Sequence, residues 1–136
     1  MTPSSLTVSE NGLGRYQQSV RIGSHHLIAD EPISAGGGDA GPAPYDYLLA
    51  ALGSCTSMTL RMYAERKAIQ LSAISVELTH EKIDTESAGK IDHITRRITL
   101  TGELSPEQSQ RMLEIANKCP VYRTLSGSIR IDSQLS

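Results

Sequence analysis

Cys55 and Cys119 are the two thiols of this chain of 136 residues, and each lies in its own predicted helical region. Cys55 stands in Gly-Ser-Cys-Thr-Ser-Met-Thr, residues 53–59, and Cys119 in Lys-Cys-Pro-Val-Tyr-Arg, residues 118–123. In a reducing compartment a pair of cysteines is more often catalytic, redox-sensing or metal-binding than a structural disulfide. The pair therefore indicates thiol redox chemistry. The alternative is two inert core residues, because free cysteine is among the most buried residue types.

Cys119 is followed directly by Pro120, which places it where one helix ends and a new turn can begin. Amide groups at a helix N-terminus stabilise a thiolate, so this position favours a reactive thiol. A cysteine that merely packs at a helix stop explains the same pattern, and the local sequence does not separate the two interpretations.

Cys55 lies on the apolar face of a predicted helix, where burial raises the pKa of a thiol unless a cation is brought beside it. A reactive Cys55 therefore needs an arginine or lysine from elsewhere in the chain. Arg15, Arg21 and Arg123 are the candidates, and each is also typical of a solvated surface residue.

Other kinds of site lack their motifs in this sequence. The Gly-rich segment 34–44 has neither the Lys-Ser/Thr of a P-loop nor the glycine register of a dinucleotide site. The four histidines, His25, His26, His80 and His93, do not show metal-ligand spacing, so we expect no metal. No Gly-x-Ser-x-Gly elbow supports a serine hydrolase.

Composition bounds the class of protein. The length predicts a single domain, residues 1–136. Charged residues make up 21%, the net charge is −2, and no Lys/Arg run is present, so nucleic acid is not an expected partner. No apolar stretch approaches the roughly 20 residues of a membrane span, and the first residues lack a signal-peptide pattern. We therefore expect a cytoplasmic protein without a membrane partner.

The elements that must position the cysteines follow from periodicity and turn residues. Short β-type stretches over residues 6–31 predict a small antiparallel meander. The Gly/Pro-rich loop 34–44 then leads into a long helical pattern over residues 45–67. Taking about 100° per residue, apolar positions lie within about 60° of Cys55, which predicts that Cys55 faces the core or an interface. These positions are Leu48, Ala51, Leu52, Met58, Thr59 and Met62.

The second half of the chain predicts a hairpin and a helix. Alternation at Ile74, Val76 and Leu78, and again at Ile94, Arg96, Ile98 and Leu100, indicates two paired strands. Ser105, Pro106 and Gln108 form a helix-start signature. Pro120 should stop or kink that helix, and a final strand is expected over Ser128–Ile131. The fold class is α+β, with the order β-β-β-α-β-β-α-β.

Three segments together carry a resemblance to a known family. They are Ala-Asp-Glu-Pro at residues 29–32, Gly-Pro-Ala-Pro-Tyr-Asp-Tyr-Leu-Leu-Ala-Ala-Leu-Gly-Ser-Cys at 41–55, and Lys-Cys-Pro-Val-Tyr-Arg-Thr-Leu at 118–125. The chain resembles the OsmC/Ohr family of thiol peroxidases over nearly its whole length. It is most similar to the OsmC-like branch, which has Pro-Tyr-Asp/Glu before the long helix.

The resemblance implies an intertwined homodimer with the two long helices buried centrally and the active sites at the subunit interface. It implies that Cys55 attacks the peroxide, that Cys119 resolves the product, and that Arg15 activates Cys55. Asp46 is the candidate acidic partner of that arginine, but it precedes Cys55 by nine residues. This spacing is about 180° around a continuous helix, so Asp46 reaches the face of Cys55 only if the first turn is irregular.

The expected activity is reduction of organic, alkyl or lipid hydroperoxides through a cysteine sulfenic acid and an intrasubunit disulfide, followed by reduction by an external dithiol or lipoylated reductant. No metal or organic cofactor is expected. An apolar pocket would favour substrates with a carbon tail over hydrogen peroxide. Its expected lining is Tyr45, Leu48, Leu52, Met58 and Met62. The alternative is a non-catalytic dimeric module that binds an apolar ligand in a stress response, with structural cysteines.

Overall fold

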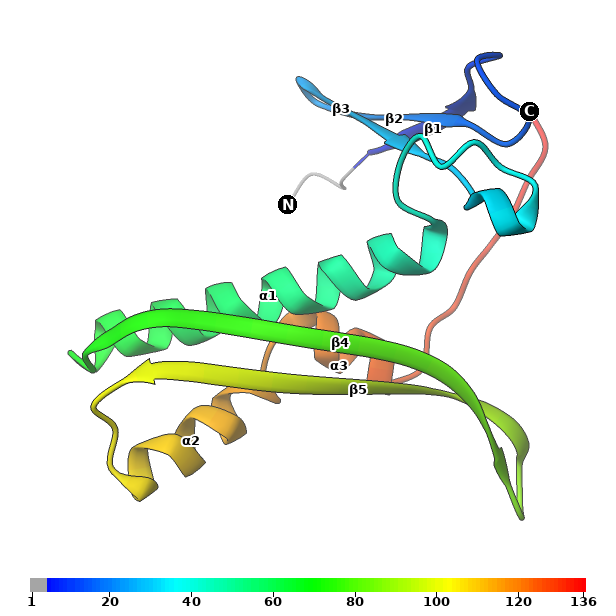
Figure 1. The fold of residues 1–136 in the computed structure, drawn as a ribbon. Coiled ribbons are helices and arrows are strands. Elements are labelled where there is room, and N and C mark those ends of the chain that lie inside the picture. The colour runs from blue at the N-terminus through cyan, green and yellow to red at the C-terminus, as the bar shows by residue number, and fades with distance from the viewer. Residues whose placement is uncertain (1–4) are drawn as a thin grey trace. The chain divides into compact units, whose positions relative to one another are not determined.

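The computed structural model of the chain describes residues 5–136, which form two compact units, residues 5–48 and 49–136. In the first unit, three short strands and a 3-10 turn precede the long helix. The strands are β1 (Thr7–Glu10), β2 (Gln18–Ile22) and β3 (His25–Ala29), and the turn is η1 (Ile33–Ala35). The strands pair antiparallel in the order β1-β2-β3 (Figure 1). The predicted meander is therefore confirmed.

The loop between β3 and the long helix is held by a buried carboxylate. Asp30 is 3% exposed and accepts hydrogen bonds from the amides of Glu31, Gly38 and Ala40, at 2.8, 3.2 and 3.1 Å. The loop also passes so close to β3 that a Cβ at Gly41 would collide with the carbonyl oxygen of Ile28. A glycine is needed there because only a residue without Cβ fits the approach.

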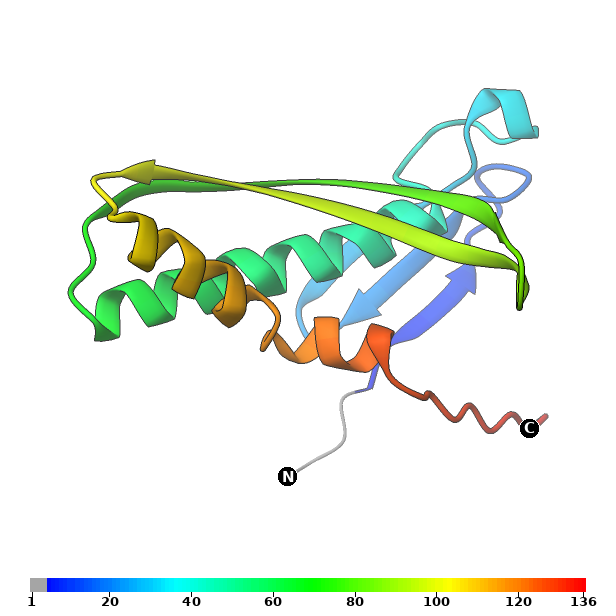
Figure 2. The same cartoon turned by 90° about the horizontal axis from the view of Figure 1, so that it is seen from below.

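Helix α1 (Pro44–Arg66) begins in the first unit and continues through the second. The other elements of the second unit are the strands β4 (Leu71–Thr85) and β5 (Gly89–Gly102), then the helices α2 (Pro106–Ala116) and α3 (Pro120–Ser126). The strands form one antiparallel hairpin. The part of α1 in this unit lies along the hairpin, and α2 covers the same side (Figures 1 and 2).

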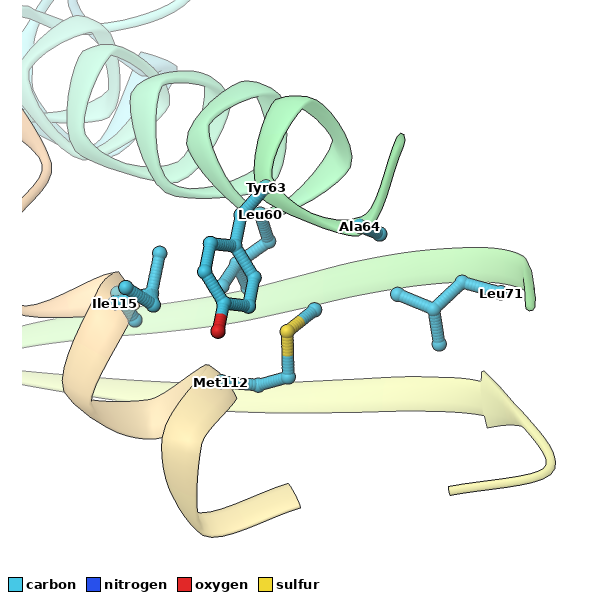
Figure 3. Packing of buried hydrophobic residues seen from close by; sticks show 7 residues of the cluster. Leu60, Tyr63, Ala64, Leu71, Met112 and Ile115 are labelled. Carbon is cyan, nitrogen blue, oxygen red and sulfur yellow. The ribbon is translucent and has the colours of Figure 1, made fainter. Parts of the chain in front are cut away.

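The core of the second unit lies between the two helices and the hairpin. Leu60 and Tyr63 of α1 point toward Met112 and Ile115 of α2, above the strands (Figure 3). Leu71 at the start of β4 closes one end of this cluster. Burial alternates along both strands as expected, with every second residue of 74–80 and of 94–100 turned inward. That alternation is the period-2 signature of a sheet with one covered face.

The N-terminus of α2 follows the predicted signature. The Ser105 hydroxyl accepts from the Gln108 amide at 3.1 Å, the Gln108 side chain accepts from the Ser105 amide at 2.9 Å, and Pro106 is the first helical residue. Each bond satisfies a backbone donor that helix geometry leaves unpaired. Pro106 has no amide hydrogen to lose there, so the boundary was readable from local sequence.

The expectation of a final strand over Ser128–Ile131 is wrong for this chain: residues 127–136 form no helix or strand. A strand exists only when its backbone pairs with a neighbour, and no strand of the described residues pairs with this segment. Its apolar residues Ile129 and Ile131 are exposed. Instead, Pro120 starts α3, so the order ends β-β-α-α within the same α+β class.

The face of helix α1 that packs on the chain's own core is not the face centred on Cys55. Its buried residues after Leu52 are Gly53, Thr56, Leu60, Tyr63 and Ala64. Met58 and Met62, which share the Cys55 side of the helix, are 60% and 64% exposed. The helix is apolar on two sides, and the chain's own core covers only one of them. These two methionines therefore do not face the chain's own core, and an interface on their side of the helix stays a prediction.

Candidate active site

The second unit brings Cys55 and Cys119 together as free thiols. Cys55 is partly buried on α1, and its thiol donates a hydrogen bond to the sulfur of Cys119. Cys119 is completely buried and is the N-cap residue of α3. Its sulfur accepts from the Tyr122 amide at 3.5 Å, and its own amide donates to the Ala116 carbonyl. The structure therefore juxtaposes the two sulfur atoms that a disulfide would join.

The two thiols are perturbed in opposite directions. Burial raises the pKa of Cys55, and the hydrogen bond and charge of Cys119 raise it further, against the weaker effects of the Val121 amide and the Thr59 hydroxyl. Burial also raises the pKa of Cys119. There, however, the donors outweigh burial, and the pKa is lowered: they are the Cys55 thiol, the amides of Tyr122 and Val121, and the Thr56 hydroxyl. Cys119 is therefore the more readily ionised thiol of the pair.

Arg96 of β5 is a cation within the same network. Its Nη1 donates to the Thr56 hydroxyl at 2.9 Å and to the Ala116 carbonyl at 3.2 Å, and its Nη2 donates to the Asn117 side chain at 2.7 Å. The guanidinium carbon lies over the ring of Tyr122, 4.9 Å from its centre. Arg96 therefore connects α1, the end of α2 and α3 around the two cysteines.

A pocket of about 310 Å³ opens beside this network. Arg96 and Tyr122 line it together with Leu52, Ile94 and Leu125, and Asp92, His93 and Ser126 add polar groups. The three aliphatic side chains offer a carbon chain an apolar surface, and the polar groups beside them can orient it. Among residues 5–136, no group of three or more His, Cys, Asp or Glu side chains is placed to hold a metal ion. No helix in that range is both long and apolar enough to cross a membrane.

Comparison with known proteins identifies the family. A family model described as OsmC-like protein matches residues 36–134, which span α1, the hairpin and both cysteines. The chain belongs to the OsmC-like family. No curated protein matches this OsmC-like chain at a significant level.

Solved structures share the OsmC-like fold at low sequence identity. An OsmC-like protein of Mycoplasma pneumoniae is 17% identical, with a TM-score of 0.77, and the match covers 93% of this chain and 89% of that chain. An organic hydroperoxide resistance protein of Legionella pneumophila is 18% identical, with a TM-score of 0.70 and coverage of 93% and 91%. That of Bacillus subtilis is 18% identical, with a TM-score of 0.65 and coverage of 93% and 92%. At such identities, the likeness establishes the fold.

The other expected site residues of this OsmC-like chain are distributed over both units. Arg15 belongs to the first unit, in the segment between β1 and β2, where its guanidinium carbon lies 5.0 Å from the centre of the Tyr16 ring. Asp46 lies in the first turn of α1 and accepts from the Ala43 amide at 2.9 Å, so its carboxylate caps the helix. Tyr45 is exposed, and Leu48 is partly buried. Neither the role of Arg15 nor that of Asp46 is tested by these positions.

The expected pocket residues of the second unit fall into two separate cavities. Leu52 lines the pocket beside Arg96, whereas Met58 and Met62 line another of about 440 Å³ with Ser57, Arg61, Glu65 and Ile74. Within the described part of this unit, the two groups of residues therefore do not form one pocket. The side chains of Leu52 and Met58 leave α1 in different directions, because six residues are about 240° apart around a helix.

Sequence reasoning missed Arg96, although a signal for it was present. The strand pattern Ile94, Arg96, Ile98, Leu100 places an arginine on the inward face of a strand whose other inward residues are aliphatic. A charged residue in that register requires polar partners, because burying an unpaired charge is costly. The partners Thr56 and Asn117 are distant in sequence, so only the fold identifies them.

Proposed function

We propose that this OsmC-like protein is a cysteine-based peroxidase that reduces organic hydroperoxides. Cys55 is the peroxide-attacking residue, because it is the more accessible of the two thiols, and Cys119 is the resolving residue. The observation that carries the proposal is the direct contact of a partly exposed thiol with a buried thiol of lowered pKa, in a chain of this family. Solved relatives described as organic hydroperoxide resistance proteins support the choice of substrate class.

The chemistry needs three balanced steps. The Cys55 thiolate attacks the distal peroxide oxygen, the O–O bond breaks, and the alkoxide leaves and takes a proton as an alcohol, so that Cys55 becomes a sulfenic acid. The Cys119 thiolate then attacks the sulfur of Cys55, and hydroxide leaves as water when it gains a proton. An external dithiol finally reduces the Cys55–Cys119 disulfide and is itself oxidised to a disulfide. The cycle requires no metal or organic cofactor.

Activation of Cys55 is the step that asks most of the protein, because its pKa is raised in the resting pair. We propose that Arg15 supplies the cation, as the family resemblance implies, and that Asp46 orients that arginine. An opposite charge within about 4–6 Å lowers a pKa by about 1–3 units, enough to offset the influence of burial.

A homodimer is part of the proposal. The exposed Met58 and Met62 form an apolar face on α1 that the second unit leaves open, and apolar faces of this kind are typical of subunit contacts. Substrate tails would contact Leu52 in the pocket beside Arg96. We place the protein in the cytoplasm, where dithiol or lipoylated reductants are available.

The deciding experiment is a peroxidase assay with purified protein. Cumene hydroperoxide and hydrogen peroxide are offered in parallel, each with a panel of dithiols that includes dihydrolipoamide. We expect turnover with cumene hydroperoxide to exceed turnover with hydrogen peroxide, because burial of the carbon tail adds binding free energy. Absence of turnover with every dithiol, while both thiols stay reduced, would exclude the peroxidase.

One observation favours a second candidate, a non-catalytic module that binds an apolar ligand. The raised pKa of Cys55 is the property of an inert thiol, and the pocket of about 310 Å³ is mostly apolar in its lining. Titration with a disulfide reagent across pH separates the two candidates. At least one fast thiol with a depressed pKa supports the enzyme, and two slow thiols support the module.

A further inference from the structure

Arg96 occupies a position where a charged side chain requires a reason. It lies between Ile94 and Ile98 in the inward register of β5, opposite Leu78 of β4. Its neighbour Arg97 is exposed on the other face of the same strand. The two arginines therefore have the same local sequence context but opposite surroundings, and only Arg96 extends toward the cysteines.

The contacts of Arg96 lie on both sides of the thiol pair. On the α1 side it binds the hydroxyl of Thr56, the residue that follows Cys55. On the other side it binds the Ala116 carbonyl, which also accepts from the amide of Cys119. Its plane also covers the ring of Tyr122, whose amide donates to the sulfur of Cys119. One rigid guanidinium fork thus connects the backbone around both sulfurs.

Thr56 links this cation to the thiol electrostatically. The hydroxyl accepts from Arg96 and therefore keeps its own proton to donate. Its single proton points to the Leu52 carbonyl at 2.7 Å, and the Cys119 sulfur is the alternative acceptor beside it, so the hydroxyl serves one of the two at a time. A hydroxyl that accepts from a cation is a stronger donor, because hydrogen bonds in a chain polarise one another.

We propose that Arg96 is the positioning residue of the cysteine pair: it fixes the turn carrying Cys55 against the loop carrying Cys119, so that the buried sulfur is aimed at its partner for disulfide closure. The proposal rests on the proposed function in one respect only, namely that a hydroperoxide is the oxidant of Cys55. Closure itself is an attack of the Cys119 thiolate on an oxidised Cys55 sulfur, in which one S–S bond forms and the group on Cys55 leaves with its electron pair.

Closure can be followed without any peroxide. The aromatic disulfide dithiobis(nitrobenzoate) reacts first with the accessible thiol of Cys55, forming a mixed disulfide and releasing one coloured thiolate. The Cys119 thiolate then attacks the Cys55 sulfur, the mixed disulfide breaks, and a second coloured thiolate is released. The rate of the second release is the closure rate, and Cys119→Ser must abolish it.

The test compares Arg96→Met with the matched control Arg97→Met, which removes one positive charge from the same strand. We expect Arg96→Met to slow the second release by about tenfold, because small misplacements of reacting groups cost large factors in rate. We expect Arg97→Met to stay within about twofold of the unaltered protein. Arg96→Lys should lie between them, because an ammonium keeps the charge but not the fork geometry.

A pH profile of closure distinguishes positioning from simple structural support. The titratable group that contacts Cys119 is Cys55 from α1, and the charged Arg96 from β5 contacts its neighbours Thr56, Ala116 and Tyr122. Asp92 and His93 of β5 line the adjoining pocket. We expect the midpoint of the profile to move to higher pH in Arg96→Met, because less of Cys119 is thiolate at a given pH. A lower melting temperature with unchanged closure rate and midpoint would show that Arg96 is only structural and would overturn the proposal.

Two further outcomes keep the test decisive. If circular dichroism shows that Arg96→Met does not fold, Thr56→Val carries the same comparison, because it removes the linking hydroxyl at nearly constant volume. Closure at the unaltered rate in Thr56→Val then overturns the proposal. Fast closure in a protein that consumes no hydroperoxide contradicts the proposed peroxidase but leaves the role of Arg96 intact. Normal hydroperoxide turnover with an unaffected closure rate in Arg96→Met supports the proposed peroxidase and overturns the role of Arg96.

Discussion

At the scale of single residues, access and ionisation select different cysteines. Cys119 has the lowered pKa but no exposed surface, whereas Cys55 is accessible but has the raised pKa. The accessible thiol is therefore the one that is harder to ionise. For the proposed two-step cycle, this means that the resolving thiol is the more readily ionised of the two and that Cys55 needs activation.

The first prediction concerns the order of those steps. Cys55→Ser should abolish consumption of even one equivalent of hydroperoxide. Cys119→Ser should still consume one equivalent and then stall as a sulfenic acid, because the nucleophile is intact but the resolving thiol is missing. A sulfenate-specific probe followed by mass spectrometry measures the trapped species. If Cys119→Ser loses the first turnover while Cys55→Ser keeps it, the two roles are reversed.

The second prediction concerns the cation that activates Cys55. Arg15→Ala should raise the pKa of the Cys55 thiol by about 1–3 units and slow hydroperoxide consumption, because removal of an opposite charge disfavours the thiolate. The rate of alkylation of Cys55 across pH, measured in the Cys119→Ser background, gives this pKa. Arg21→Ala is the control, since Arg21 is also exposed and lies on β2 of the same unit. Equal effects of both substitutions would contradict the choice of Arg15.

At the scale of elements, helix and loop boundaries depend on a few hydrogen bonds from side chains to backbone amides. Asp46 caps α1, the Ser105 and Gln108 pair caps α2, and Cys119 caps α3. Asp30 does the same for a loop, by accepting from three of its amides. At α3 the capping group is itself a thiol. A chemical change at Cys119 therefore also alters the hydrogen bond that starts this helix.

The third prediction uses the carboxylate of Asp30, whose pKa is lowered chiefly by the amide of Ala40, with the amides of Glu31 and Gly38 outweighing the opposite effect of burial. A lowered folded-state pKa contributes stability that is present above the unfolded value near 3.9 and is lost as pH falls through the folded value. Asp30→Asn should therefore lower the melting temperature at pH 7, and its difference from the unaltered protein should shrink as the pH falls below about 3.9.

Asp39→Asn is the matched control for this measurement. Asp39 is exposed in the same loop with φ 54°, a conformation that asparagine also tolerates. We expect its melting temperature to stay close to that of the unaltered protein at both pH values. A difference for Asp30→Asn that is independent of pH would show that the carboxylate's charge does not stabilise the loop.

At the scale of the whole molecule, the second unit leaves apolar surface on α1 uncovered. The fourth prediction is that the protein is a homodimer in solution and that Met58→Lys reduces its mass toward that of a monomer. The substitution places a charge on an apolar face that a second copy would bury, while Met58 is 60% exposed and is not among the buried core residues. Light scattering at micromolar concentration measures the mass.

Thr99→Lys is the control, because Thr99 lies on the exposed face of β5. It should leave the mass unchanged. A monomeric mass for the unaltered protein would refute the dimer, and a dimer that Met58→Lys leaves intact would place the interface on another surface.

Local patterns in the sequence determined the fold class and most of the elements. The meander, the long helix, the hairpin and the start of α2 each depend on periods of two or 3.6 residues, or on capping and turn residues within a few positions. Such signals are readable because the physical interactions behind them are local. The prediction of a final strand is wrong because strand formation is not local. The alternation of Ser128–Ile131 suits a strand, but the segment has no neighbouring strand to pair with among the described residues.

The tertiary structure alone decided which residues surround the sulfurs. Thr56 and Arg96 are 40 residues apart, and nothing local joins them. The same holds for the choice of the buried face of α1, because the helix is apolar on two sides and only packing against α2 and the hairpin selects Leu60 and Tyr63 over Met58 and Met62. The sequence determined that two cysteines lie in helical surroundings. The fold determined that they meet and that Arg96 lies between the segments that carry them, because contacts between distant segments depend on how the whole core packs.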